Sequence, residues 1–290
     1  RYRNVRPNEP CVTKLSMADI DKMRIAGTIR QLEEFETPLA FCDMFCVPEW
    51  AKMRRRRVVN PIPVNDACGR ETLRPLTLPS RREFRQAAHE GSHVACLDAA
   101  SFFDQFPLHR DIGRYFSFVA RDRKIYCLTS MAMGQRQSTE VATALMHVIA
   151  SFHHPGVRVD IVTDNIRFVG SRANVATAVG LFCDRCRDVG VVLNDLPPSP
   201  SRTEIDDAVS TEADFLGEII NYGEKSVKCR QKIVDRVREL WELRGAWTNR
   251  QQVGLVAILL WCSGPLRIPL VRRYVSLSFL RDQGRKLQSD

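Results

Sequence analysis

Apolar and polar positions along the chain follow two periods, and these periods predict which segments are strands and which are helices. Residues 157–161 and 166–168 alternate between apolar and polar, which predicts two half-buried strands on either side of a tight turn. Asp and Asn tolerate left-handed backbone, so Thr163-Asp164-Asn165 suits the tip of this hairpin. Residues 92–97 predict a buried strand, and residues 139–152, a longer apolar run without Gly or Pro, predict a buried helix.

The remaining segments predict further elements around this centre. We expect a mostly helical and irregular stretch over residues 1–50, a basic strand from Arg54, helices over 74–90, 112–120, 173–189 and 228–244, and strands over 124–129 and 214–221. Thr248-x-x-Gln251 is a capping-box signature, which predicts the start of an apolar helix that ends near Gly264. The central order predicts an α+β fold around a split βαβ antiparallel sheet with helices on one face.

Length and charge narrow the class of protein. The 290 residues are natural for two or three lobes, and 44% hydrophobic with 27% charged residues describes an ordinary globular chain. Lys and Arg number 43 against 34 Asp and Glu, so the formal net charge is +9. A basic excess favours a polyanionic partner, most simply nucleic acid, although a generically basic protein has the same balance.

Cysteine usage and hydropathy bear on compartment and membrane. The ten cysteines fall well below the density of a disulfide scaffold, which favours a reduced, intracellular setting. Cys183-x-x-Cys186 has no second ligand pair at zinc-finger spacing, so a zinc site is not favoured. The most apolar run, residues 253–261, is shorter than the about 20 residues that span a bilayer, and we expect no membrane partner.

Two aspartates stand where strands end. Asp98 closes the apolar run Ser92–Leu97 and is followed by small residues and by Phe102-Phe103, while Asp164 lies at the hairpin tip. Two carboxylates delivered by adjacent strands can hold two divalent metals, which stabilise the attacking and leaving oxygens of a phosphoryl displacement. This arrangement indicates a nucleotidyl transferase. Taken singly, Asp98 also fits a strand-end cap and Asp164 an ordinary turn residue.

Five segments in this order resemble those of the reverse transcriptase family of right-hand polymerases. The most specific is Asp98-Ala99-Ala100-Ser101-Phe102-Phe103-Asp104-Gln105-Phe106-Pro107-Leu108, which resembles the family's first catalytic segment. The others are Arg56-Arg57-Val58-Val59-Asn60-Pro61, Met131 to Ser138, Val162-Thr163-Asp164-Asn165 and Phe215-Leu216-Gly217. The segments around Gly134 and Phe215 resemble gypsy-like or tyrosine-recombinase (VIPER-like) retroelements.

The resemblance implies a three-lobed layout and an activity. It implies fingers over residues 1–92 with 112–137 returning to them, a palm over 93–111 and 138–222, and a helical thumb over 223–290. The implied activity is template-directed DNA synthesis, in which a primer 3′-hydroxyl attacks a dNTP on an RNA or DNA template. Mg²⁺ is the implied cofactor, with Mn²⁺ as a possible substitute.

The residues implied to act have physical reasons to do so. Asp98, Asp164 and the backbone carbonyl of Ala99 supply oxygen ligands to metal, and Asn165 stands in the catalytic hairpin. Arginine suits bidentate phosphate contact, and a bulky side chain under the sugar excludes a 2′-hydroxyl. The residues implied to bind the dNTP are Arg56, Arg57, Phe103, Gly134 and Gln135, and those implied to grip the primer are Phe215, Leu216 and Gly217. Several of these residues also have a purely structural explanation: Phe103 as a core residue, the arginine run as a solvated face and Gly134 as a turn residue.

Three departures from the family pattern bear on activity. Val162 and Asn165 stand where the family has an aromatic residue and a second Asp, so the metal site loses one negative charge. Ala132-Met133-Gly134 replaces the common Leu-Pro-x-Gly, and the Lys expected after Leu193-Asn194 is missing. Two alternatives therefore stand beside the polymerase: an impaired or domesticated copy that only binds nucleic acid, and an unrelated basic α+β binding module.

Overall fold

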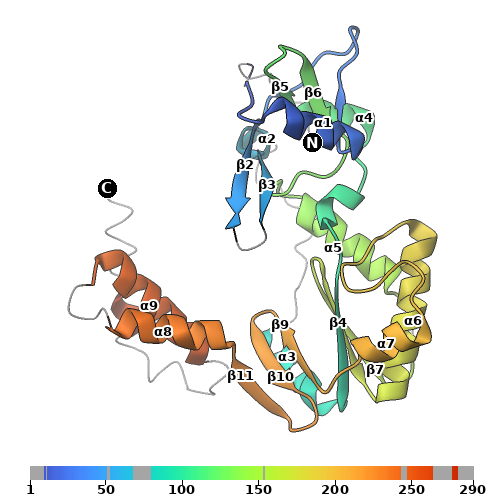
Figure 1. Ribbon diagram of the computed structural model, residues 1–290, viewed down its shortest axis with the longest axis vertical. Helices are drawn as coiled ribbons and strands as arrows, with labels where there is room; N and C mark the ends of the chain where they lie inside the picture. Colours follow the sequence, from blue (N-terminus) through green and yellow to red (C-terminus); the bar gives the residue numbers. More distant parts are fainter. Residues whose placement is uncertain are drawn as a thin grey trace.

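A three-stranded antiparallel sheet forms the centre of the computed structural model, which describes residues 10, 12–50, 53–67, 80–152, 154–242, 247–263 and 276–279. Its strands are β4 (His93–Asp98), β8 (Asn165–Gly170) and β7 (Val157–Val162), in the order β4-β8-β7 (Figure 1). The predicted strand at 92–97 and the predicted hairpin at 157–168 are confirmed, with bounds that differ by one or two residues.

The register of this sheet sorts its side chains by chemistry. Asn165 pairs with Asp98 on one side and Val162 on the other, and Arg167 pairs in the same way with Cys96 and Asp160. Successive side chains of a strand point to opposite faces, so these residues share one polar face. The intervening residues share the opposite, apolar face: Ala95, Leu97, Val159, Ile161, Ile166 and Phe168.

Two long helices cover the apolar face. The helices α5 (Ser138–Ile149) and α6 (Arg172–Val189) pack on it, and α7 (Arg202–Ala208) packs on α6. Met146 and Phe182 are fully buried there, and the Phe182 ring lies 5.4 Å from that of Phe168. The predicted helices over 139–152 and 173–189 are confirmed, and they cover one face of the sheet as predicted.

A second sheet covers part of the polar face. It has the order β11-β10-β9 and consists of β9 (Glu212–Phe215), β10 (Glu218–Asn221) and β11 (Ser226–Cys229), with α3 (Arg81–Gln86) and the 3₁₀ helix η3 (Ala87–His89) beside it. The prediction of one strand over 214–221 is wrong, because Leu216 (φ 51°) and Gly217 (φ 89°) turn the chain back on itself. Two successive positive φ angles are what a two-residue hairpin of type I′ requires.

The upper part of the molecule in Figure 1 is built from short elements. One sheet has the order β1-β6-β5 and another pairs β2 with β3. The strands are β1 (Ile29–Gln31), β2 (Asp43–Glu49), β3 (Arg54–Asn60), β5 (Ser117–Val119) and β6 (Ile125–Leu128), and the helices are α1 (Met17–Ile25), α2 (Ile62–Ala67), α4 (Arg110–Gly113) and η5 (Arg114–Phe116). The 3₁₀ helix η4 (Phe102–Gln105) instead packs on α5 and on the core under the central sheet.

Two sequence-based expectations fail in this part. Residues 1–50 are expected to be mostly helical and irregular, and this expectation misses the strands β1 and β2, the second of which is seven residues long. The helix expected over 112–120 ends at Phe116, because Ser117–Val119 pair with β6 as an edge strand. Tertiary pairing overrides local propensity in both segments. Of the helix expected over 74–90, residues 74–79 lie outside the described residues.

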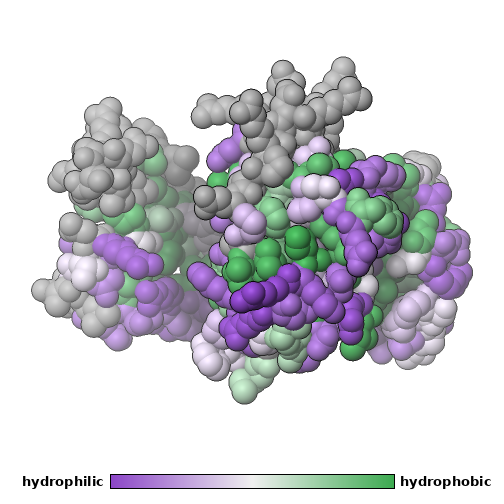
Figure 2. Space-filling model, turned by 90° about the horizontal axis from the view of Figure 1, so that it is seen from above, coloured by the Kyte–Doolittle hydropathy of each residue, from purple (hydrophilic) through white to green (hydrophobic). Residues whose placement is uncertain are grey.

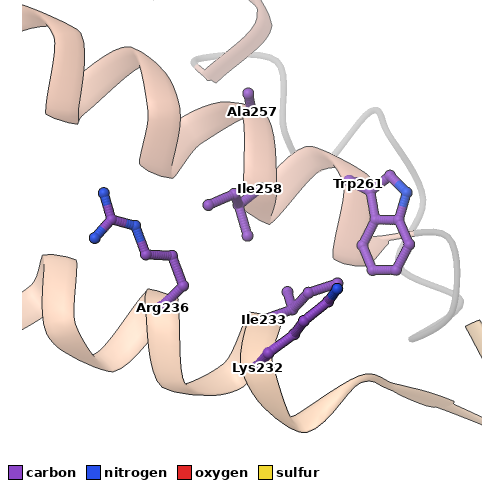
Figure 3. A pocket seen from close by; sticks show the side chains of 6 residues that line it. All are labelled: Lys232, Ile233, Arg236, Ala257, Ile258 and Trp261. Atoms are coloured by element: carbon purple, nitrogen blue, oxygen red, sulfur yellow. The ribbon is translucent and has the colours of Figure 1, made fainter. Parts of the chain in front are cut away.

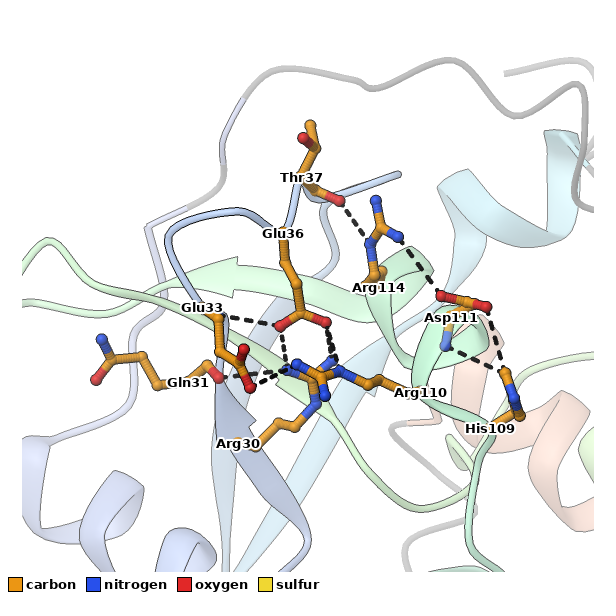
Figure 4. A network of polar contacts seen from close by, with 9 residues as sticks. All are labelled: Arg30, Gln31, Glu33, Glu36, Thr37, His109, Arg110, Asp111 and Arg114. Carbon is orange, nitrogen blue, oxygen red and sulfur yellow. Dashed lines mark hydrogen bonds and ion pairs between the residues drawn. The ribbon is translucent and has the colours of Figure 1, made fainter.

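A buried carboxylate joins the loop after β1 to α4 (Figure 4). Glu36 accepts hydrogen bonds from Arg30 at 2.7 Å, from Arg110 at 2.8 Å and from the Glu33 backbone at 3.0 Å. The hydrogen bonds from Arg30 and then Arg110 hold the pKa of Glu36 well below its usual value. The carboxylate therefore remains charged, and it fixes the outer loop of the upper part.

Two helices form a unit that lies beside the rest of the molecule in Figures 1 and 2. They are α8 (Gln231–Glu242) and α9 (Asn249–Ser263). The predicted capping box is confirmed, since the Thr248 N–H donates to Gln251 at 2.9 Å and the Gln251 N–H donates to the Thr248 hydroxyl at 3.3 Å. Among the described helices, none combines the length and apolarity needed to cross a membrane.

Phe182→Ala tests the core under the sheet. Removing a fully buried aromatic ring should lower the free energy of unfolding by about 3–5 kcal/mol, because the cavity forms in a closed core. Leu181→Ala is the matched control, since the neighbouring Leu181 side chain is 45% exposed. Denaturant unfolding followed by circular dichroism measures both, and equal losses would contradict this account of the core.

Candidate active site

Asp98 is the last residue of β4 and is held on three sides. Its N–H donates to the Asp195 carboxylate at 2.7 Å, and its carbonyl accepts from the Asn194 N–H at 2.8 Å. The Asn194 side-chain amide donates to the Asp98 carboxylate at 2.6 Å. The Asp98 side chain is half-buried, so one carboxylate is presented at the head of the polar face in a fixed orientation.

Asp164 reaches the same place from the hairpin between β7 and β8. Its carbonyl accepts a hydrogen bond from the Ala99 N–H at 2.9 Å, which joins the hairpin tip to the residue after Asp98. The Asn165 amide donates to the Asp164 carboxylate at 3.0 Å. Thr163 has φ 59°, a region that β-branched residues rarely adopt, so the tip holds backbone strain of the kind found at functional sites.

The two carboxylates act on each other electrostatically. Burial is the largest influence on Asp164 and raises its pKa above the ordinary 3.8, and the negative charge of Asp98 raises this pKa further. The hydrogen bond from Asn165 and the positive charge of Arg56 act in the opposite direction. A half-buried pair of like charges is an unfavourable arrangement that a cation would relieve.

Phe103 lies in η4, in the segment that follows β4, and hydrogen bonds of Gln105 hold the end of this segment. Ser101 has φ 45°, and η4 follows directly. The Gln105 amide donates to the Val192 carbonyl at 3.0 Å and accepts from the Val192 N–H at 2.6 Å. The Phe103 ring is half-buried against the core and meets Phe102 edge-on at 5.2 Å, so its position is fixed without complete burial.

The two arginines predicted to hold a triphosphate have different surroundings. Arg56 is half exposed, contacts Glu49 at 3.3 Å and the Met133 sulfur at 3.8 Å, and acts electrostatically on Asp164. Arg57 points to the other face of β3, where it donates to Thr28 at 2.8 Å and forms an ion pair with Asp104. Arg56 is therefore the one of the two that faces the carboxylates.

Gly134 and Gln135 form the turn before α5. Gly134 is exposed with φ 88°, and its carbonyl accepts from the Asn65 side chain at 3.0 Å. The Asn65 side chain also accepts from the Arg136 N–H at 2.9 Å, so it braces the turn from both ends. Gln135 is buried, and its side-chain carbonyl accepts from the Ser138 hydroxyl at 2.7 Å.

The segment predicted to grip a primer is a turn with one buried anchor. Phe215 is 3% exposed and meets the Phe84 ring edge-on at 5.3 Å. Leu216 and Gly217 form the turn itself, and a Cβ at Gly217 would lie 3.4 Å from the Trp261 ring of α9. The turn therefore lies between the polar face of the central sheet and the α8–α9 unit.

Four residues around the site escaped the sequence analysis. Asn194 and Asp195 hold Asp98, and Asp195 stands directly after Leu193-Asn194, where the family resemblance implies a lysine. Their polarity after an apolar run was the available signal. Asp160 and Arg167 are buried on the polar face. Their positions in the alternating pattern of the hairpin were visible, but nothing in that pattern shows that they pair.

The described residues contain no group of three or more His, Cys, Asp or Glu side chains placed to hold a metal. Cys183 and Cys186 lie in the core under the sheet, where burial raises the pKa of the Cys183 thiol to about 11 and that of the Cys186 thiol to about 12.

A pocket of about 620 Å³ lies between α8 and α9 and shares no lining residue with the carboxylate pair (Figure 3). It is lined by Lys232, Ile233, Arg236, Ala257, Ile258 and Trp261.

Comparison with known proteins gives a structural likeness alone. No family model matches the chain, and no curated protein matches its sequence. Three solved structures of foamy viral protease-reverse transcriptase are similar to 88% of the chain at 14% identity: one in complex with double-stranded DNA (TM-score 0.64), one with an RNA/DNA hybrid (0.62) and another with double-stranded DNA (0.61). The chain spans 42%, 32% and 50% of those proteins. The chain thus has a reverse-transcriptase-like α+β fold.

Proposed function

We propose that this chain is the polymerase part of a retroelement reverse transcriptase, which transfers a nucleotide from a dNTP to a primer 3′-hydroxyl. The observation that carries the proposal is the meeting of Asp98 and Asp164, joined by the hydrogen bond between Ala99 and Asp164 at the head of the polar face. The fold similarity to proteins solved with DNA and with an RNA/DNA hybrid, and the net charge of +9, support a nucleic-acid substrate.

The residues present fit a divalent metal. Mg²⁺ is usually held by one or two carboxylates together with substrate phosphates, and Asp98 and Asp164 are such a pair with an unfavourable like-charge contact. When bound, the metal supplies positive charge to the attacking and leaving oxygens of the displacement. Asn194 and Asn165 orient the two carboxylates, and the backbone of Ala99 keeps them at a fixed separation.

Other residues have roles in handling the nucleotide. Arg56 offers its guanidinium to the phosphates beside the carboxylates, while Arg57 keeps β3 in place through Asp104. Phe103 presents a fixed ring under the sugar, and Gly134 allows backbone to approach the new base pair closely. Gln135, which is buried, supports the Gly134 turn.

The layout that we propose follows the three parts of the molecule. Residues 1–92 with 112–137 act as fingers, and of these α3 and η3 lie beside the second sheet instead of in the upper part. Residues 93–111 and 138–222 act as the palm that carries the carboxylates. Residues 223–290, which include α8 and α9, act as a thumb, although much of this stretch lies outside the described residues. Phe215, Leu216 and Gly217 hold the primer end between palm and thumb.

One observation favours a second candidate, a nucleic-acid-binding protein without turnover. Asn165 replaces a carboxylate beside Asp164, and the described residues offer no third ligand at the pair that meets the geometry of a metal cluster. Such a protein would bind primer–template through its excess of Lys and Arg whether or not Asp98 and Asp164 carry charge.

Asp98→Asn and Asp164→Asn separate these two candidates. Each should lower the rate of primer extension with dNTPs by about a thousandfold, because the amide cannot provide the charge that holds metal. Primer–template affinity should change little, since binding to the phosphate backbone depends on Lys and Arg side chains. Asp184→Asn, an exposed site on α6, is the control. Wild-type protein that binds but does not extend in Mg²⁺ or Mn²⁺ would favour the binding protein.

Arg56→Ala and Arg57→Ala test the assignment of the arginines. Arg56→Ala should raise the KM for dNTP by about tenfold or more, because a charge-assisted phosphate contact is lost. Arg57→Ala should mainly lower thermal stability, since it leaves Asp104 without its ion pair. Steady-state kinetics and thermal unfolding of both variants test this assignment. A raised KM for dNTP in Arg57→Ala together with lowered thermal stability in Arg56→Ala would contradict it.

Asp164→Asn should stabilise the folded protein at pH 7 when no metal is present. The pKa of Asp164 is raised in the folded state, so above that pKa folding must hold a charge that burial disfavours. The increase in the free energy of unfolding over wild type should persist at neutral pH, and it should shrink as the pH falls through the raised pKa of Asp164 towards 3.8. Denaturant unfolding between pH 3 and 7 measures it. A variant less stable than wild type at pH 7 would contradict this account.

A further inference from the structure

Arg167 is a cation buried in the middle of the central sheet. Its side chain is fully buried, and it donates to the Asp160 carboxylate at 3.1 and 2.5 Å from two different nitrogens. A third nitrogen donates to the Phe84 carbonyl at 3.1 Å and to the Tyr222 hydroxyl at 3.0 Å. The guanidinium also stacks over the Phe215 ring at 4.4 Å.

These contacts connect two parts of the proposed active site. Along β8, Arg167 is two residues from Asn165 on the same face, a separation of about 7 Å, so it lies one row below the carboxylates. Phe215 directly precedes the Leu216-Gly217 turn, and Tyr222 follows β10, the other strand of that hairpin. One side chain thus contacts both the metal-binding hairpin and the proposed primer-grip hairpin.

The neighbouring helix α3 strengthens the same connection. Phe84 of α3 contributes its carbonyl to Arg167 and its ring to Phe215. Arg85 of α3 forms hydrogen bonds with Glu218 at 2.8 and 2.5 Å, and Glu218 is the pairing partner of Phe215 across the turn. The primer-grip hairpin is therefore attached to the central sheet through directional contacts as well as through apolar packing.

Stability alone is a poor explanation for such a residue. A buried ion pair contributes little net stability compared with well-packed apolar side chains, because both charges lose their hydration. The planar guanidinium, with five fixed donors, instead defines the relative positions of the groups that it contacts.

We propose that Arg167 is a positioning residue, which sets the placement of the Leu216-Gly217 turn relative to Asp98 and Asp164 and so aligns the primer 3′-terminus with the metal site. The inference rests on the proposed function. It assigns to Arg167 no contact with substrate: its effect passes through Tyr222 and Phe215 on one side and through β8 on the other.

Arg167→Met and Tyr222→Phe test the proposal, with Arg158→Met as the matched control. Arg158 lies on the same face of the sheet and also pairs with Asp160, at 3.0 Å, but it contacts Glu90 at 2.7 Å where Arg167 contacts the primer-grip hairpin. Two quantities are measured on a primer–template with 2-aminopurine at the primer 3′-end: the fluorescence of that base, which rises when the base is not held, and kcat for extension.

Arg167→Met should raise the 2-aminopurine fluorescence and should lower kcat by about tenfold or more, because a small misplacement of reacting groups has a large kinetic cost. The Kd for primer–template and the KM for dNTP should stay within about twofold of the wild-type values. Tyr222→Phe should shift both readouts in the same direction by about threefold. Arg158→Met should leave the fluorescence unchanged.

The inference would be overturned if Arg167→Met and Tyr222→Phe both had the fluorescence and kcat of the wild-type protein. It would also be overturned if Arg158→Met changed the fluorescence and kcat as much as Arg167→Met does. If Arg167→Met does not fold, Tyr222→Phe decides, since it keeps the Asp160 pair and the volume of the ring. If wild-type protein binds primer–template but does not extend it, the proposed function fails, and the fluorescence of the bound primer still tests the positioning role by itself.

Discussion

The pairing register of β8 with β4 and β7 is the constraint on which the rest of the structure depends. It places Asn165 opposite Asp98 and Arg167 opposite Asp160, and it directs Ile166 and Phe168 to the helices α5 and α6. A slip of one residue would move every side chain of β8 to the other face, burying polar groups under the helices. The burial of an aromatic and aliphatic core thus fixes, on the opposite face, the row of polar residues that forms the site.

The same row combines features that disfavour folding. Thr163 holds a left-handed backbone, Asp164 is a half-buried carboxylate beside Asp98, and Arg167 and Asp160 are charges in the interior. Each costs stability that the apolar core under the sheet offsets. Their concentration on one face of one sheet is the physical argument for proposing a functional site there.

The central elements were predictable because their sequence signals are local. Alternation over residues 157–168 predicts the hairpin, and the Thr248–Gln251 capping box predicts the start of α9. Elements that depend on distant pairing were missed: β2 forms because β3 is available, and Leu216 and Gly217 turn the chain where apolar residues suggested a continuous strand. Within the site, Asp98 and Asp164 end recognisable strands, whereas the attachment of Arg57 to Asp104 and of Arg167 to Tyr222 depends on tertiary contacts.

Anomalous diffraction would test the central claim most directly, with crystals that contain the chain, a primer–template, a non-hydrolysable dNTP and Mn²⁺. The account predicts two manganese peaks about 3.5–4 Å apart, ligated by Asp98 and Asp164 and by the phosphates of the nucleotide. Manganese bound away from both carboxylates, or no manganese at the site while nucleotide and primer–template are in place, would contradict it.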